Sequence, residues 1–203
     1  MKAVLLNKTI REIKLMKKNL VFIGMPAVGK STVGIVVAKR LGMQFIDTDL
    51  LIQEREGKLL REILAEKGQS GFLEIENQVN LAVDPENAVI SPGGSVVYCR
   101  EAMEHYKKIG TVVYLKASYQ TIKKRIRNPK RRGVVLREGQ TLRNLYDERA
   151  PYFEKYADIT VCEDGCRIEE TIENVLNAVK KRRKNSRKNR RRRRKPDSRI
   201  RSD

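Results

Sequence analysis

The chain has 203 residues, a length that suits one domain with extensions. No apolar run approaches the roughly 18 residues that a membrane span requires, so we expect a soluble, cytoplasmic protein that contacts no membrane. The single histidine, His105, excludes a histidine-based triad or metal cluster. The three cysteines, Cys99, Cys162 and Cys166, lack the paired spacing of a zinc site and indicate reduced thiols, although Cys162 and Cys166 remain an alternative pair.

The formal net charge of +19 is concentrated at the two ends of the chain. Residues 180–203 contain 15 Lys or Arg and 2 acidic residues, and residues 1–18 contain 6 and 1. Residues 19–179 contain 23 basic and 22 acidic residues, so the central part is nearly neutral. We predict a dispensable extension over 1–18, a domain over 19–180 and a disordered basic tail over 181–203. The tail either contacts nucleic acid without sequence preference or is a solvated segment with no partner.

Short apolar runs alternate with helical patterns from Asn19 onward. Predicted strands lie near residues 20–24, 44–47, 88–91, 111–115 and 158–161. Predicted helices lie near residues 30–41, 58–67, 71–82, 100–108, 117–127, 139–155 and 167–180. This alternation is typical of parallel strands joined by crossover helices, so we predict an α/β three-layer sandwich. Ligands are then expected beyond the carboxyl ends of the strands.

The first predicted strand runs directly into a phosphate loop. Residues 24–31 read G-M-P-A-V-G-K-S, the complete G-x-x-x-x-G-K-S pattern between a strand and a helix. Glycines at both ends permit a tight turn whose N–H groups face phosphate oxygens. Lys30 supplies positive charge to the β- and γ-phosphates, and Ser31 is suited to bind Mg²⁺. The residues expected to hold ATP or GTP here are Gly24, Ala27, Val28, Gly29, Lys30, Ser31 and Thr32.

Two aspartates follow the second predicted strand. Asp47 and Asp49 are separated by one residue, which in an extended segment points both carboxylates to the same side. One carboxylate can position hydrated Mg²⁺ while Asp49 accepts a hydrogen bond from a hydroxylated substrate and orients or deprotonates the attacking hydroxyl. The alternative is that both aspartates only cap a helix.

Three later segments add candidate site residues. The loop at 91–95, Ser-Pro-Gly-Gly-Ser, either lets the backbone approach a small ligand closely or is a simple turn. The basic segment at 125–133 suits a mobile lid that closes arginines over a triphosphate, with a solvated charged face as the alternative. The helix after it contains Glu148-Arg149-Ala150-Pro151-Tyr152, and Arg149 is expected to reach a carboxylate ligand.

The order of these motifs resembles the shikimate kinase family over about residues 19–178. The resemblance implies the nucleoside-monophosphate-kinase-like P-loop fold with a five-stranded parallel sheet. It also implies a kinase that uses ATP and Mg²⁺ to phosphorylate the 3-hydroxyl of shikimate, a step towards chorismate and the aromatic amino acids. We expect this enzyme to be a monomer.

The resemblance assigns roles to residues at the nucleotide end of the site. It makes Lys30 the phosphate lysine, and Ser31 and Asp47 the residues that hold Mg²⁺. Arg132, in Arg-Gly-Val-Val where the family usually shows R-P-L-L, matches the catalytic lid arginine at the phosphates. Arg125 best matches the adenine-stacking arginine, with Arg127 as the competing match.

The acceptor end matches the family at four residues and departs from it at two. The resemblance makes Asp49, Gly93, Gly94 and Arg149 the shikimate-binding residues. The family typically has F-R-x-x-E where this chain has Phe72-Leu73-Glu74-Ile75-Glu76, so leucine replaces an arginine that clamps the shikimate carboxylate. Ser95 also replaces the third glycine of the loop.

The departure at Leu73 and the basic tail leave three interpretations of function open. Another cation, such as Arg61 one helix earlier, compensates for Leu73, and shikimate is the acceptor. Alternatively, the chain is a kinase of the same fold that acts on another small hydroxylated acid or polyol. A third interpretation is a nucleotide-binding protein that associates with nucleic acid through its basic tail.

Overall fold

The computed structural model describes residues 19–126, 134, 136–137 and 139–193, and for residues 187–193 the backbone alone. The strands are β1 Asn19–Ile23, β2 Gln44–Asp47, β3 Ala88–Ser91, β4 Gly110–Lys116 and β5 Ile159–Cys162. The helices are α2 Lys30–Leu41, α3 Thr48–Glu56, α4 Leu60–Ala82, α5 Arg100–Ile109, α6 Tyr119–Arg125, α7 Leu142–Tyr156 and α8 Ile168–Arg193, with a 3₁₀ helix η1 at Val96–Tyr98.

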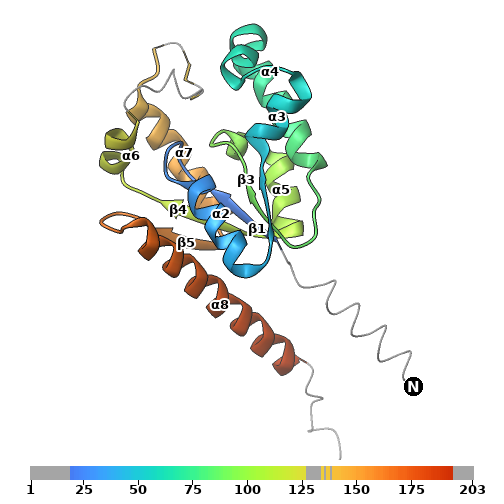
Figure 1. The fold of residues 1–203 in the computed structure, drawn as a ribbon. Helices are drawn as coiled ribbons and strands as arrows, with labels where there is room; N and C mark the ends of the chain where they lie inside the picture. Colours follow the sequence, from blue (N-terminus) through green and yellow to red (C-terminus); the bar gives the residue numbers. More distant parts are fainter. Residues whose placement is uncertain (1–18, 127–133, 135, 138, 194–203) are drawn as a thin grey trace, which may run out of the picture.

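The five strands form one parallel sheet in the order β2-β3-β1-β4-β5 (Figure 1). The central strand, β1, is buried at every position. Its Val21 pairs with Ile90 of β3 on one side and with Val112 of β4 on the other. Runs of β-branched residues are typical of parallel strands that are covered on both faces. The predicted five-stranded parallel α/β sheet is confirmed.

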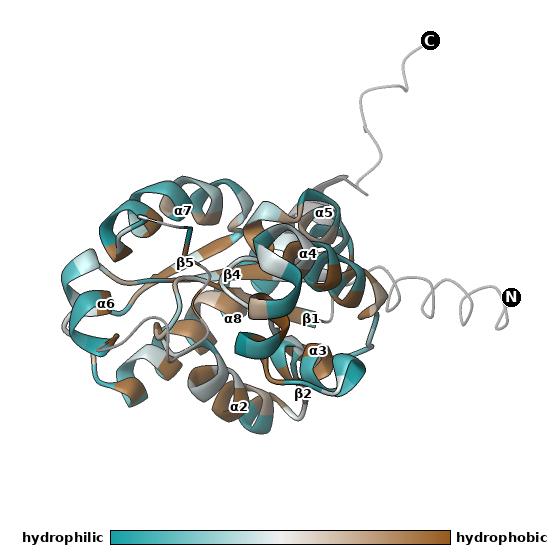
Figure 2. Cartoon of the chain, turned by 90° about the horizontal axis from the view of Figure 1, so that it is seen from above, coloured by the Kyte–Doolittle hydropathy of each residue, from teal (hydrophilic) through white to brown (hydrophobic). Residues whose placement is uncertain are grey.

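Helices cover both faces of this sheet. On one face α2 packs against β1, β3 and α8, and on the other α5 and α7 pack against β4. Figure 2 shows the hydrophobic strands between these two helical layers. The core fills the space on both sides of the sheet with side chains such as Phe22, Val37, Met103, Phe153 and Val175. The result is the predicted three-layer sandwich.

Three strands end at the same edge of the sheet and lead into the predicted site segments. β1 runs into the phosphate loop, β2 ends on Asp47, and β3 ends on Ser91 just before the Gly93-Gly94 loop. Because the strands are parallel, their carboxyl ends bring these three segments together.

The segment around the two aspartates differs from the prediction. Asp47 is extended as the last residue of β2, but a helix absent from the predicted elements, α3, begins at Thr48 and contains Asp49. The alternative that these aspartates cap a helix therefore holds for Asp47. Asp47 is the N-cap of α3, and its Oδ1 accepts a hydrogen bond from the Asp49 backbone N–H at 3.1 Å. Aspartate is a preferred N-cap because its carboxylate satisfies an unpaired N–H of the first turn. Asp47 therefore caps the helix that carries Asp49.

Helices α4 and α8 are both longer than predicted. α4 joins two predicted helices across Gly68, whose φ of 66° and ψ of −176° interrupt the helical geometry. α8 continues to Arg193, so the prediction of disorder from residue 181 is wrong for residues 181–193. Lysine and arginine are good helix formers, and the guanidinium of Arg182 fixes the helix to Asp158 through contacts of 2.9 Å to its backbone oxygen and its Oδ1.

Three parts of the predicted domain division lie outside the described residues. These are the N-terminal extension at 1–18, most of the predicted lid, including Arg127 and Arg132, and the end of the predicted tail, residues 194–203. No helix in the described part of the chain is both long enough and apolar enough to cross a bilayer.

Candidate active site

The phosphate loop connects β1 to α2 through a backbone that requires glycine at two points. At Gly24, φ is 149°, and a Cβ would lie 2.6 Å from the backbone oxygen of Leu115. Gly29, the N-cap of α2, has φ of 107°. Ala27 also has a positive φ, 62°, and Val28 packs in the core. This geometry places the amino terminus of α2, with its unpaired N–H groups, at the edge of the sheet.

Lys30 bends back over this loop. Its Nζ donates hydrogen bonds to the backbone oxygens of Gly24 at 3.1 Å and Met25 at 3.3 Å. Burial lowers the pKa of the Lys30 ammonium, while Asp49 acts in the opposite direction. The lysine is thus held where phosphate oxygens bound by the loop would meet it.

Ser31 and Asp47 form the pair of oxygens that the sequence predicts for magnesium. The Ser31 hydroxyl donates a hydrogen bond of 2.7 Å to Asp47 Oδ2 and lies 3.3 Å from the Ser91 hydroxyl. Mg²⁺ is usually held by one or two protein oxygens together with phosphates and water. A hydroxyl and a carboxylate next to the phosphate loop fit that requirement.

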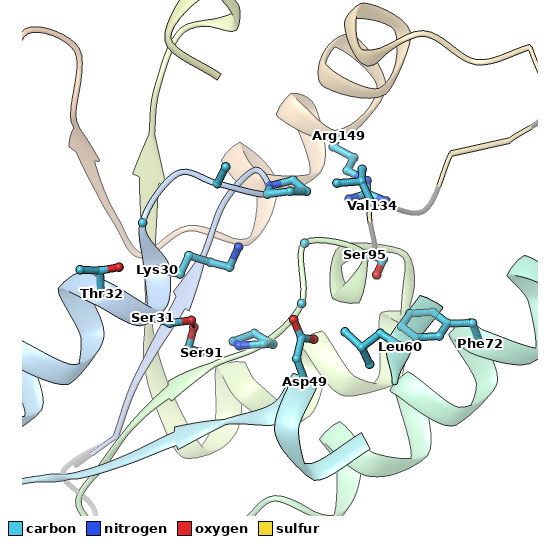
Figure 3. A pocket seen from close by; sticks show the side chains of 16 residues that line it. Lys30, Ser31, Thr32, Asp49, Leu60, Phe72, Ser91, Ser95, Val134 and Arg149 are labelled. Carbon is cyan, nitrogen blue, oxygen red and sulfur yellow. Dashed lines mark hydrogen bonds between the residues drawn. The ribbon is translucent and has the colours of Figure 1, made fainter. Parts of the chain in front are cut away.

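A cavity of about 320 Å³ opens beside the loop. Figure 3 shows Lys30, Asp49 and Arg149 approaching it from α2, α3 and α7. Leu60 and Phe72 form an apolar wall on the α4 side. The other lining residues are Pro26, Ala27, Gly29, Ser31, Thr32, Ser91, Pro92, Gly93, Gly94, Ser95 and Val134.

Asp49 is a partly buried carboxylate that lines this cavity. Burial and the neighbouring Asp47 carboxylate raise its pKa to about 6, against the opposing effect of Lys30. A base works best when its pKa lies near the operating pH. Asp49 is therefore suited to accept a proton from a hydroxyl bound in the cavity.

Arg149 is a fixed cation, with only 1% of the residue exposed. Its Nε donates to the Tyr98 hydroxyl at 3.3 Å, and its guanidinium carbon lies 5.1 Å from the centre of the Tyr98 ring. The Tyr98 hydroxyl in turn donates to Glu148 at 2.8 Å. A Cβ on Gly94 would lie 3.2 Å from Arg149 Nη1, so the glycine loop passes close to the guanidinium. This arrangement suits a bound carboxylate.

Gly93 separates Asp49 from a fully buried carboxylate, Glu76. A Cβ on Gly93 would lie 2.6 Å from Glu76 Oε1 and 2.8 Å from Asp49 Oδ1. Burial raises the pKa of Glu76 to about 8. Sequence reasoning assigned no role to Glu76, although its position four residues after Phe72 on α4 places both on one helical face.

Some predicted residues lie elsewhere. Arg125 does not line the cavity but donates from Nη1 to the Val28 backbone oxygen at 2.8 Å and to Glu163 Oε2 at 2.7 Å. Leu73, which stands where the family has an arginine, packs against the core with an uncharged side chain. The side chain of Arg61 is 62% exposed and does not line the cavity. The geometry therefore does not support Arg61 as the replacement for the missing arginine.

Comparison with protein families and curated proteins gives a consistent result. The family model described as Shikimate kinase matches residues 26–180. The shikimate kinase of Sulfurihydrogenibium sp. (strain YO3AOP1) is 34% identical over 166 residues, which cover 81% of this chain and 99% of that protein. The shikimate kinase of Actinobacillus succinogenes is 36% identical over 152 residues, covering 73% of this chain and 87% of that protein.

Solved structures show the same fold. The shikimate kinase of Aquifex aeolicus superposes with a TM-score of 0.70 at 30% identity and covers 80% of this chain and 96% of its own. The shikimate kinase of Acinetobacter baumannii, solved in complex with shikimate, gives a TM-score of 0.71 at 23% identity, covering 84% of this chain and 97% of its own. The family match ends at residue 180, where the basic part of α8 begins.

Proposed function

The chain belongs to the shikimate kinase family, and from this premise we propose that it transfers the γ-phosphate of ATP to the 3-hydroxyl of shikimate. The observation that carries the proposal is the convergence of Lys30, Asp49 and Arg149 on one cavity of about 320 Å³ beside the phosphate loop. This arrangement combines a phosphate-binding cation, a base and a carboxylate-binding cation in the order that the reaction needs.

The nucleotide end of the site holds and activates the γ-phosphate. The N–H groups at the start of α2 bind phosphate oxygens, and Lys30 neutralises the charge on the β- and γ-phosphates. Ser31 and Asp47 are the residues that would hold Mg²⁺, and bound Mg²⁺ supplies further neutralisation of the phosphate oxygens. Arg132, outside the described residues, is the proposed lid cation.

At the acceptor end, Arg149 binds the shikimate carboxylate, while Gly93 and Gly94 let the backbone approach the ring. The 3-hydroxyl oxygen attacks the γ-phosphorus, and the bond from that phosphorus to the β–γ bridging oxygen breaks as ADP leaves. Asp49 accepts the hydroxyl proton. Since transfer of this kind depends on alignment, the fixed position of Arg149 also sets the distance between hydroxyl and phosphate.

Acceptor choice is tested by ADP release with Mg·ATP and a panel of shikimate, other hydroxylated acids and neutral polyols. We expect turnover of shikimate at ordinary kinase rates, on the order of 1–100 s⁻¹. The matched control is Arg149→Lys, which keeps the charge but loses the bidentate geometry and should raise the KM for shikimate. Turnover of another acid or polyol without turnover of shikimate would assign the chain to a different acceptor.

A second candidate function is supported by the end of α8. Residues 180–193 include 11 Lys or Arg and no acidic residue. Arg182 contacts Asp158, which immediately precedes β5, so this part of the helix has returned to the amino edge of the sheet (Figure 1). We propose that this basic helix, with the residues that follow it, associates with nucleic acid while the cavity at the opposite edge stays open.

One experiment distinguishes the kinase activity from the proposed nucleic-acid binding. Labelled RNA binding is measured by anisotropy for the full chain and for a chain that ends at Lys180, at rising salt. We expect the full chain to bind with an affinity that falls steeply between about 50 and 200 mM salt, and the shortened chain to lose binding while keeping kinase activity. Equal RNA binding by both chains would reject the role of the helix.

A further inference from the structure

Glu76 is a buried carboxylate without an ion-pair partner among the described residues. It lies on α4 with 0% of the residue exposed, and both of its carboxylate oxygens are buried without a hydrogen bond. Asn80 donates to the backbone oxygen of Glu76 and not to its carboxylate. Three residues earlier on the same helix is Leu73, which is partly buried and packs against the core.

The charged groups around Glu76 come from three helices. Burial is the main cause of its raised pKa, and the Ser95 side chain opposes the rise. Asp49 on α3 adds to the rise through space, while Arg149 on α7 and Lys30 on α2 oppose it. Three uncharged side chains also lie near Glu76: Ser95 just before η1, Cys99 between η1 and α5, and Tyr106 on α5. Burial raises the pKa of Cys99 to about 12 and that of Tyr106 well above 10, and Glu76 adds to both shifts.

Glu76 and Asp49 flank the same glycine. A Cβ on Gly93 would contact an oxygen of each, at 2.6 Å and 2.8 Å. Two ionised carboxylates this close repel each other, so one of them takes up a proton more readily. Asp49 has Lys30 as a compensating cation and lines the cavity, whereas Glu76 has no contacting cation and is fully enclosed.

A charge buried without a partner is expensive, and a carboxyl group avoids the cost by binding a proton. We propose that Glu76 is a neutral carboxylic acid in the working enzyme, and that Leu73 and neutral Glu76 together keep the acceptor side free of a second negative charge. An anionic acceptor then binds through Arg149 without a cation at position 73. This inference rests on the proposed function, and Glu76 acts as a positioning residue through Gly93 and Asp49.

The net charge of residues 73 and 76 is the same in this chain as in the family pattern, if Glu76 is neutral. An arginine at position 73 beside an ionised Glu76 contributes no net charge, and neither does leucine beside a neutral Glu76. If Glu76 ionises, the acceptor side gains one negative charge that no neighbouring side chain offsets by contact. An acceptor carboxylate is then repelled, whereas a neutral polyol or the nucleotide is affected much less.

The kinetic test compares the wild type with Glu76→Gln, which mimics the neutral acid, across roughly pH 6 to 10. The matched control is Glu74→Gln, because Glu74 lies exposed on the same helix. We expect the wild-type KM for shikimate to rise about tenfold per pH unit above a pH of about 8. The KM of Glu76→Gln for shikimate should not change over this pH range, and the KM of Glu74→Gln should rise as in the wild type. An equal rise in all three proteins would reject the proposal.

A second measurement does not depend on turnover. Carboxyl ¹³C resonances of glutamate-labelled protein are titrated, and Glu76→Gln identifies the Glu76 signal. We expect a midpoint of about 8 in the wild type and a much lower one in Leu73→Arg, where a guanidinium pairs with the carboxylate. A wild-type midpoint near the ordinary 4.5 would overturn the proposal even if shikimate is phosphorylated. A midpoint near 8 without shikimate turnover would uphold the neutral Glu76 and reject only the acceptor.

Discussion

Arg125 and Glu163 form an ion pair of 2.7 Å behind the phosphate loop. Glu163 is 3% exposed, and its second carboxylate oxygen is buried without a hydrogen-bond partner. The same Arg125 nitrogen also donates to the Val28 backbone oxygen at 2.8 Å. The pair thus fastens the end of α6, from which the predicted lid departs, to the loop after β5 and to the phosphate loop itself.

Removing this pair should weaken nucleotide binding and the fold together. Glu163→Ala leaves Arg125 without its carboxylate partner, so we expect unfolding free energy to fall by about 1–3 kcal/mol and the KM for ATP to rise. The control is Glu154→Ala, because Glu154 pairs with Lys116 on the surface, where both side chains are about half exposed. That change should cost less than about 1 kcal/mol. Equal losses in the two variants, measured by urea denaturation, would contradict the prediction.

Asp49→Asn should remove the base while leaving the nucleotide site intact. We expect kcat to fall by roughly 10²–10⁴-fold, because proton acceptance by a positioned side chain contributes about that much. The KM for ATP should change little, since Asp49 lies on the acceptor side of Lys30. Steady-state kinetics with both substrates varied measures whether kcat falls while the KM for ATP is kept. A variant with near wild-type kcat would show that the hydroxyl proton leaves by another route.

Gly93→Ala should damage acceptor binding specifically. The new Cβ would come within 2.6 Å of Glu76 and 2.8 Å of Asp49, so both carboxylates must move. We expect the KM for shikimate to rise at least about tenfold, which corresponds to about 1.4 kcal/mol. Gly57→Asn is a suitable comparison, because Gly57 has φ of 65°, which asparagine tolerates, and open space around it. If both variants bind shikimate equally well, the close approach at Gly93 has no role in binding.

The raised pKa of Glu76 also predicts how stability changes with pH. The carboxyl has a pKa of about 8 in the folded protein and an ordinary value of 4.5. Between these values the folded state holds a proton that the unfolded state has lost, so unfolding free energy falls as pH rises from 4.5 to about 8. In Glu76→Gln, the unfolding free energy should fall less over this pH range than in the wild type, by at least about 1 kcal/mol. If the unfolding free energies of the two proteins change in parallel with pH, the raised pKa of Glu76 is ruled out.

Local motifs were sufficient to predict much of the fold and part of the site. The phosphate loop, the alternating strands and helices, and the order of motifs led to the parallel sheet and to the shikimate kinase family, and both are confirmed. Lys30, Asp49, Gly93, Gly94 and Arg149 line one cavity because each follows or faces the carboxyl end of a strand.

Features that depend on tertiary surroundings were not predicted. Helix α3 has only nine residues and lacks a clear apolar period, so it was not predicted, and the capping role of Asp47 was only the alternative interpretation. Glu76 and Glu163 look like ordinary surface glutamates in the sequence, and only the packing of other elements buries them. Arg125 was assigned to adenine stacking from alignment, which carries no information about its carboxylate partner in β5–α8.

The most direct test of the proposed reaction is the position of the new phosphate on the product. Purified protein is incubated with ATP, Mg²⁺ and shikimate, and the product is examined by ³¹P–¹H correlation spectroscopy, with Lys30→Met as the inactive control. We expect a phosphate coupled to the proton at carbon 3 of shikimate with the wild type, and no such product with the variant. The absence of that coupling with active wild-type protein, or its persistence in Lys30→Met, would contradict phosphoryl transfer by this site.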